Sequence, residues 1–108
     1  MAQTTPQQRI GEQAELRALR HLRQVGLGLI ERNYRCRFGE VDLIMSDNET
    51  VVFVEVRFRR NDRFGGAAAS VDQRKRRRLI ATAEHFLHAN NPLRHRPALT
   101  ALVAITEP

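Results

Sequence analysis

Asp42 and Glu55 are the residues of this 108-residue chain whose types and positions are best suited to chemistry. The apolar alternation of residues 39–45 and 51–59 predicts two β-strands, and the polar residues 46–50 predict a turn between them. Because side chains alternate between the faces of a strand, a hairpin brings Asp42 beside Glu55 on one face. Two acids in the middle of apolar strands cost folding free energy unless something neutralises them. Either Arg57 or a divalent cation would do so.

The same alternation predicts which strand faces are buried. In the second strand the buried face carries Val52, Val54, Val56 and Phe58, and the opposite face carries Phe53, Glu55, Arg57 and Arg59. In the first strand one face carries Val41, Leu43 and Met45, and the other carries Glu40, Asp42 and Ile44. Glu40 therefore shares the face of Asp42. Two roles are open for it, an outer-sphere acid beside a cation or a partner for an arginine.

A helix and a strand are expected before this hairpin. Thr5 and Pro6 suit the cap and first turn of a helix that Gly26 ends, and residues 1–5 are expected to form a flexible polar tail. The helix has an apolar stripe at spacings of four and three: Ile10, Ala14, Ala18, Leu22 and Val25. Glu12 lies off the centre of this stripe, as a solvated acid would. Residues 27–37 predict a basic, partly exposed strand.

A second helix and a last strand are expected after the hairpin. Ser70 and Gln73 match the capping-box pattern, and the helix they begin extends to about residue 89. Its inner stripe contains Leu79, Ala83 and Phe86, joined by Ile80 and Leu87. Lys75 lies one turn before Leu79 on that stripe and so points inward or along the sheet. Residues 99–106 predict the final strand. The whole is an α/β domain of order αβββαβ, with a mixed sheet flanked by helices.

The basic side chains suit a polyanion such as nucleic acid. The net charge is +6, from seventeen arginines and a single lysine, Lys75, set against twelve acids. Several arginines have two possible roles: they either lie on a solvated face or contact phosphates. They are Arg59, Arg63, Arg74, Arg76, Arg77 and Arg78. Residues 60–69 form a glycine-containing connector. It is either an ordinary linker or a loop that orders over DNA, with Phe64 as its stacking residue.

Other residues bear on the class of protein. Cys36 is the single cysteine, so no internal disulfide is expected, and no cysteine–histidine pattern predicts zinc. Four histidines have no spacing typical of a metal site or a nucleophile, and surface positions are expected for them: His21, His85, His88 and His95. The sequence shows no apolar signal segment or membrane-spanning run, so a cytoplasmic location without membrane contact is expected.

The order of these motifs resembles the YraN-type family of small bacterial proteins, predicted endonucleases related to archaeal Holliday-junction resolvases. The spacing of Asp42, Glu55 and Arg57 is similar to the Asp…Glu-x-Lys core of the PD-(D/E)XK nuclease superfamily. Further matching residues cover most of residues 10–87: Gly11, Glu12, Ala14, Asn33, Tyr34, Arg35, residues 39–44 and 52–57, Ser70, Val71, Lys75 and Leu79. The resemblance implies a single domain over residues 1–108 with a restriction-endonuclease-like core.

The resemblance also implies metal-dependent hydrolysis of a phosphodiester bond. Asp42, Glu55 and, from the first helix, Glu12 would hold Mg²⁺ or Mn²⁺, which lowers the pKa of water and screens phosphate charge. Arg57 stands where the superfamily has lysine, and arginine binds phosphate but is a poor general base. Lys75 would then supply an ammonium group, or it simply pairs with Glu55 or Asp42. The family's Arg-Phe-Asp before the last strand is replaced here by Leu99-Thr100-Ala101.

The leading interpretation is a structure-selective DNA endonuclease that acts on branched DNA as a homodimer, since a four-way junction needs two cuts and one small domain carries one site. The alternative is a nucleic-acid-binding protein that keeps the nuclease fold without cleavage. A purely protein-binding adaptor would explain neither the Asp42–Glu55 pair nor the charge. Fold analogy alone does not establish activity.

Overall fold

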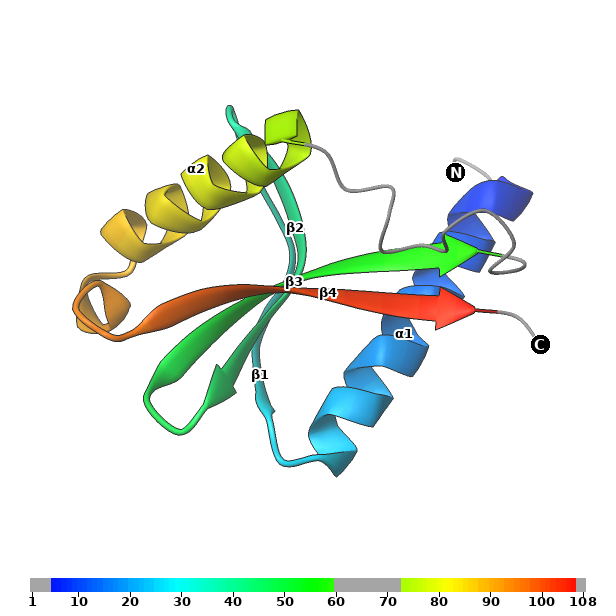
Figure 1. The fold of residues 1–108 in the computed structure, drawn as a ribbon, viewed down its shortest axis with the longest axis horizontal. Coiled ribbons are helices and arrows are strands. Elements are labelled where there is room, and N and C mark those ends of the chain that lie inside the picture. Colours follow the sequence, from blue (N-terminus) through cyan, green and yellow to red (C-terminus); the bar gives the residue numbers. More distant parts are fainter. Residues whose placement is uncertain (1–4, 60–72, 107–108) are drawn as a thin grey trace, which may run out of the picture.

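The computed structural model describes residues 5–59 and 73–106, which form two helices packed on opposite faces of a four-stranded sheet (Figure 1). The elements are α1 (Pro6–Gln24), β1 (Gly28–Cys36), β2 (Gly39–Asp47), β3 (Thr50–Arg59), α2 (Gln73–Ala89), the short 3₁₀ helix η2 (Asn91–Leu93) and β4 (Ala98–Thr106). Strand order is β1-β2-β3-β4, with β4 parallel to β3 and the other pairs antiparallel. The expected αβββαβ order and mixed sheet are confirmed.

Three of the sequence expectations fall outside these described ranges. They are the tail at residues 1–4, the connector with Arg63 and Phe64, and Ser70 of the expected capping box. Neither helix in the described ranges has the length and apolar character needed to cross a bilayer.

Helix α1 begins at a capping box and ends before a glycine with positive φ. Thr5 Oγ1 accepts from the Gln8 N–H at 3.1 Å, and Gln8 Oε1 accepts from the Thr5 N–H at 2.8 Å. Gly26 has φ 104° just past the end of the helix. Two stripe residues, Ala14 and Ala18, are buried as expected, but Val25 is 60% exposed. Val25 leaves the stripe because it is the C-cap, and Leu19 is buried in the core instead.

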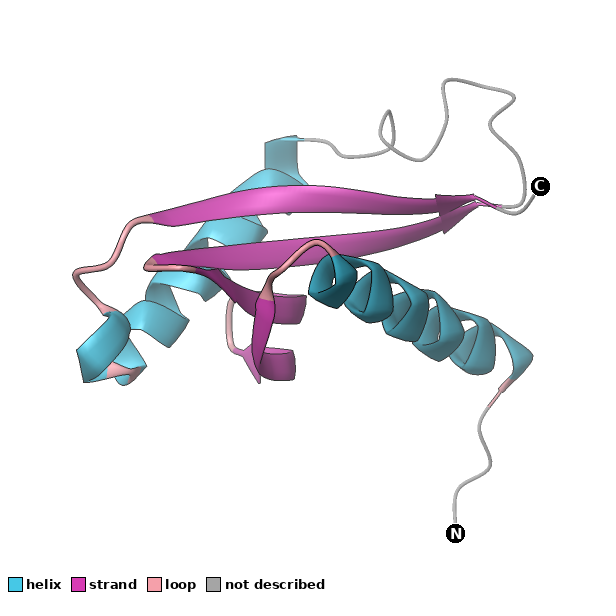
Figure 2. Cartoon of the chain, turned by 90° about the horizontal axis from the view of Figure 1, so that it is seen from below, coloured by secondary structure: helices cyan, strands magenta, loops and turns pink. Residues whose placement is uncertain are grey.

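Strand β3 lies in the centre of the core and is covered on both faces. On the α1 side, Val52 and Val54 pack with Leu43 and Met45 of β2 and with the helix residues Ala18 and Leu19. On the α2 side, Val51 and Phe53 pack with Val41, Ile44, Ala83 and Phe86. Figure 2 shows the two helices in this arrangement, with β3 and β4 side by side. β3 is therefore packed from both sides, and Glu55 and Arg57 follow its buried segment.

The two middle strands separate at one end, and we call the region between Asp42 and Val56 the fork. β2 pairs with β3 from Leu43↔Val54 to Asp47↔Thr50, whereas toward its start it continues alongside β1 (Figure 1). Val41 packs with Ile44 on the α2 side, so the expectation that it shares a face with Leu43 and Met45 was wrong. At this end of the ladder the Val56 N–H donates to the side chain of Asp42.

Helix α2 lies close to the turn that joins β1 to β2. Ala83 and Phe86 are buried as expected, but Ile80 is 46% exposed. A polar residue, Thr82, is fully buried instead, and its hydroxyl donates to the Arg78 carbonyl at 2.7 Å. A Cβ on Gly39 would lie 3.3 Å from Thr82 Oγ1, so the small threonine and the glycine let the strand approach the helix. This contact orients the first turns of α2 over the fork.

Candidate functional site

A cavity of about 530 Å³ lies between the first turns of α2 and the strands β2, β3 and β4. Its lining comes from all four elements: Gly39, Glu40, Glu55, Arg57, Lys75, Arg76, Arg78, Leu79, Thr100, Ala101 and Leu102. The structure therefore brings Glu55, Arg57 and Lys75 together from β3 and α2. Lys75 is half-buried, in keeping with its place on the inner stripe.

Asp42 lies at the fork beside Glu55. Its Oδ2 accepts the backbone N–H of Val56 at 2.7 Å, so the carboxylate lies against the peptide bond that joins Glu55 to Val56. Burial is the main cause that raises the pKa of Asp42. The Val56 hydrogen bond and the Arg57 charge oppose this rise, while Glu40 adds to it. The half-buried carboxylate is thus fixed in position and lacks full charge compensation.

Glu55 has a similar environment. Burial raises its pKa first, and the charge of Asp42 raises it further. Arg57 and, more weakly, Lys75 lower it. Arg57 Nη2 lies 3.4 Å from Glu55 Oε1, and both side chains are mostly buried. The fork therefore holds two mutually repelling acids and one arginine, a charge balance that is typical of cation and catalytic sites.

Glu15 of α1 is an acid that the sequence analysis missed. Its side chain is 17% exposed, with Oε1 4.0 Å from Arg32 Nη2 and without a hydrogen-bond partner among the described residues. Burial, followed by the charge of Asp42, raises its pKa from 4.5 to about 7. The available signal was its spacing, since Glu15 lies four residues before the buried Leu19.

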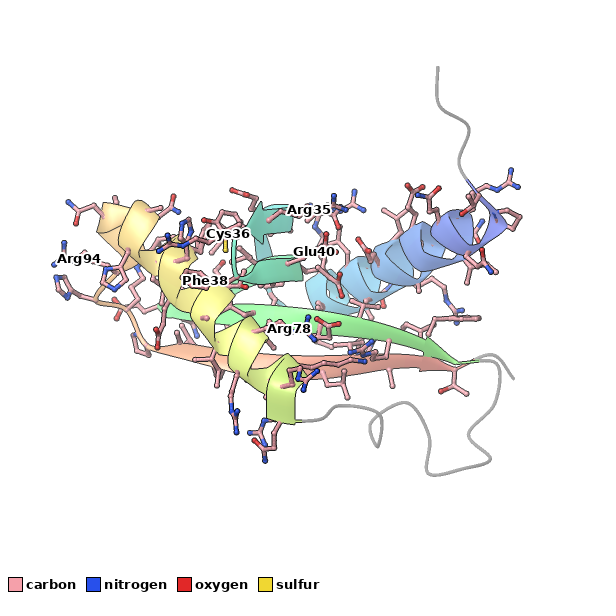
Figure 3. The ribbon with its side chains drawn as sticks, turned by 90° about the horizontal axis from the view of Figure 1, so that it is seen from above. Arg35, Cys36, Phe38, Glu40, Arg78 and Arg94 are labelled. Carbon is pink, nitrogen blue, oxygen red and sulfur yellow. The ribbon has the colours of Figure 1, made fainter. Side chains whose placement is uncertain are left out.

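Glu12, the acid singled out from the sequence, is exposed on α1, and its charge acts on Glu15. Glu40 is also exposed and forms an ion pair with Arg35 across β1 and β2. Figure 3 shows this pair on the hairpin. Glu40 also lines the cavity together with Glu55. It therefore has an arginine partner and also lies near the acids of the site.

Comparison with known proteins places this chain among bacterial relatives. A family described as "Uncharacterised protein family UPF0102" matches residues 14–104. The chain belongs to this family. UPF0102 proteins that resemble it come from Stutzerimonas stutzeri (52% identical, covering 91% of this chain and 82% of the relative), Alcanivorax borkumensis (54%, covering 81% and 70%) and Methylobacillus flagellatus (56%, covering 79% and 77%).

Membership in UPF0102 confirms the expected family but assigns no reaction, because neither the family description nor these relatives' names state one. The matched region includes Glu15, Asp42, Glu55 and Lys75, whereas Glu12 lies before it. The chemistry of this UPF0102 chain must therefore be judged from its own site.

Whether the site of this UPF0102 chain suits a magnesium ion depends on the carboxylates that it offers. Within residues 5–59 and 73–106, no three side chains of histidine, cysteine, aspartate or glutamate gather closely enough to hold an ion. Mg²⁺, however, is commonly bound through one or two carboxylates together with water and substrate phosphate. Asp42 and Glu55 supply such a pair. The buried Arg57 Nε, which has no partner among the described residues, is a donor that suits a phosphate oxygen.

Two arginines of α2 lie in the wall of this site. Arg74, Arg76, Arg77 and Arg78 are exposed, and Arg76 and Arg78 line the cavity. Arg59 is the last residue of β3. The exposed arginines at the mouth of an acidic site suit a polyanion whose phosphate must reach the acids.

Proposed function

We propose that this protein is a metal-dependent endonuclease that hydrolyses phosphodiester bonds in DNA, as its resemblance to resolvase-type nucleases implies. The observation that supports this most directly is the meeting of Asp42 and Glu55 at the fork, beside a cavity lined by Arg57 and Lys75. The exposed arginines of α2 would contact the flanking phosphates.

Each side chain has a distinct part in this proposal. Asp42 and Glu55 would hold Mg²⁺ or Mn²⁺, which when bound supplies a Lewis acid and lowers the pKa of water. The Val56 N–H donates to Asp42 Oδ2 and orients this carboxylate. Arg57 stabilises negative charge on the phosphate but transfers no proton near neutral pH. Lys75 adds a compact cation from the helix.

Cleavage assays in Mg²⁺ and in Mn²⁺ test the proposal, with linear duplex, flap and four-way-junction DNA. We expect the wild type to cut branched DNA and both Asp42→Asn and Glu55→Gln to abolish cutting. Asp47→Asn is the matched control, because Asp47 is an exposed acid at the other end of β2. Cutting by the Asp42 and Glu55 variants at the wild-type rate would contradict the proposal.

A second candidate is a nucleic-acid-binding protein that keeps this fold without cleavage. The ion pair between Arg57 and Glu55 favours it, because this arginine occupies a position where related nucleases have lysine and neutralises one of the two acids. In that case the wild type binds DNA but cuts none of the substrates. Arg57→Lys is then the variant in which nicking should appear.

A homodimer is also part of the proposal, because a four-way junction requires two cuts and twofold dimers are the commonest oligomers. Light scattering with and without junction DNA checks this. A monomeric mass in both conditions would contradict it.

A further inference from the structure

The turn between β1 and β2 exposes an aromatic ring in basic surroundings. Phe38 is 39% exposed, and the guanidinium carbon of Arg37 lies 4.8 Å from the centroid of its ring. Arg35 on the same hairpin has a side chain that is 79% exposed. Figure 3 shows Phe38 beside α2, with Arg35 and Glu40 on the other side of the hairpin.

A chain of rings supports Phe38 from below. Its ring lies edge-on to His85 of α2, with centroids 6.1 Å apart and planes at 66°. His85 Nδ1 and the Tyr34 hydroxyl form a hydrogen bond of 2.6 Å, and Tyr34 packs edge-on against the buried Phe86. His85 itself is half-buried. The exposed ring is therefore anchored to the core.

The backbone of the turn is fixed as well. Gly39 has φ 148°, and a Cβ there would lie 3.3 Å from Thr82 Oγ1 and 3.8 Å from Arg78 Cβ. The hairpin thus lies directly against α2. This contact keeps Phe38 against α2 at His85.

We propose that Arg37 and Phe38 form a platform on which an unpaired nucleobase of branched DNA stacks. The proposal rests on the nucleic-acid part of the proposed function and specifies the substrate. Exposed aromatic rings within a basic surface stack on bases of any sequence, and an arginine plane adds to the stacking. A protein partner with an apolar surface would meet a single ring covered by Arg37 and gain little from it.

The position of the platform relative to the acids fits this substrate. Phe38 and Asp42 are four steps apart along the chain, with three residues of β2 between them, which corresponds to about 13 Å along a strand. A base on the platform would therefore lie a few nucleotides from a phosphate at the fork. Bases inside a continuous duplex are already stacked, so the platform would select DNA with splayed or displaced bases.

Tryptophan fluorescence tests this directly, because the sequence contains no tryptophan. Phe38→Trp introduces a single reporter, and the titration is done in EDTA so that no cleavage can occur. We expect strong quenching by splayed-arm or four-way-junction DNA and little quenching by linear duplex at equal saturation. Leu16→Trp, on an exposed position of α1, is the matched control and should be quenched by neither.

Affinity provides the second measurement. Phe38→Ala should weaken binding of splayed-arm DNA by about tenfold and leave duplex binding unchanged, while Phe38→Trp should bind like the wild type. Circular dichroism is used as a control to check that both variants are folded. Absence of quenching in Phe38→Trp, or equal loss of both DNA forms in Phe38→Ala, would overturn the platform.

The outcome separates this inference from the endonuclease. Quenching in EDTA combined with no cleavage by the wild type supports the platform and contradicts only the endonuclease. Cleavage by the wild type without quenching contradicts the platform and leaves the endonuclease standing.

Discussion

Lys75 has a half-buried side chain in the cavity wall beside Glu55 and Arg57. Because the other seventeen members of the lysine–arginine class are all arginine, a lysine here indicates a need for a smaller, more compact cation. We predict that Lys75→Arg lowers the cleavage rate while DNA affinity hardly changes, since the charge is kept. Single-turnover cleavage and binding titrations check this, with Arg17→Lys on the exposed side of α1 as the control. Full activity in Lys75→Arg would make it an ordinary basic residue.

Glu15 predicts a pH dependence of stability. Its pKa is raised from 4.5 to about 7 in the folded protein, mainly by burial, so the folded state holds a proton that the unfolded state has already lost in this range. The contribution of Glu15 to the free energy of unfolding therefore falls as the pH rises from 4.5 to about 7 and is constant above.

We predict that Glu15→Gln is more stable than the wild type by about 1 kcal/mol at pH 8, a value discounted for partial solvation, and has no such advantage at pH 4. Urea denaturation at both pH values measures this. Glu12→Gln is the matched control, an exposed acid on the same helix, and should show no pH-dependent gain. An equal difference between wild type and Glu15→Gln at both pH values would contradict the prediction.

Individual site residues were predictable only where one local rule decided them. Strand periodicity was enough to place Asp42 near Glu55, and helical phase was enough to turn Lys75 inward. Glu15 was missed because its burial depends on how α1 lies over the fork, beside Arg32 of β1. The hydrogen bond of His85 was not predictable for the same reason, since its partner Tyr34 is far away in the sequence.

At the scale of elements, the contact between the β1–β2 hairpin and α2 fixes the position of the Phe38 turn and of the cavity wall that Gly39 and Arg78 form. Gly39 makes this contact with a positive φ and little free space. We predict that Gly39→Ala lowers the free energy of unfolding by about 1–3 kcal/mol, because alanine is strained at that φ and its Cβ crowds Thr82. Urea denaturation measures the change.

Gly11→Ala is the matched control for this substitution. A Cβ at Gly11 meets nothing within 4 Å, and Gly11 lies inside α1. Helix propensity then predicts a gain of about 0.5–1 kcal/mol. If Gly39→Ala and Gly11→Ala changed the free energy of unfolding in the same direction, close packing at the hairpin would not explain the effect of Gly39→Ala.

Element order was predictable because capping, periodicity and turn residues agree along the chain, from the Thr5 cap to the last strand. The face of Val41 was not predictable. The β2–β3 ladder ends where the Val56 N–H donates to the side chain of Asp42. The alternation of apolar and polar residues in the sequence does not predict this hydrogen bond. The prediction for Val41 therefore failed next to the fork, where Asp42 and Glu55 lie close together.

The whole molecule carries a net charge of +6, and arginines are exposed on both helices. If DNA binds across the cavity, the arginines of α2 should contact phosphates and those of α1 should not. We predict that Arg74→Gln with Arg77→Gln reduces the slope of log affinity against log salt concentration by about two, since each phosphate contact releases counterions.

The pair Arg17→Gln with Arg20→Gln removes the same charge from exposed positions of α1 and should leave the slope unchanged. Titrations of splayed-arm DNA over a range of salt concentrations measure both slopes. Equal reductions in the two double variants would mean that charge acts diffusely over the molecule, and the DNA path across α2 would be wrong.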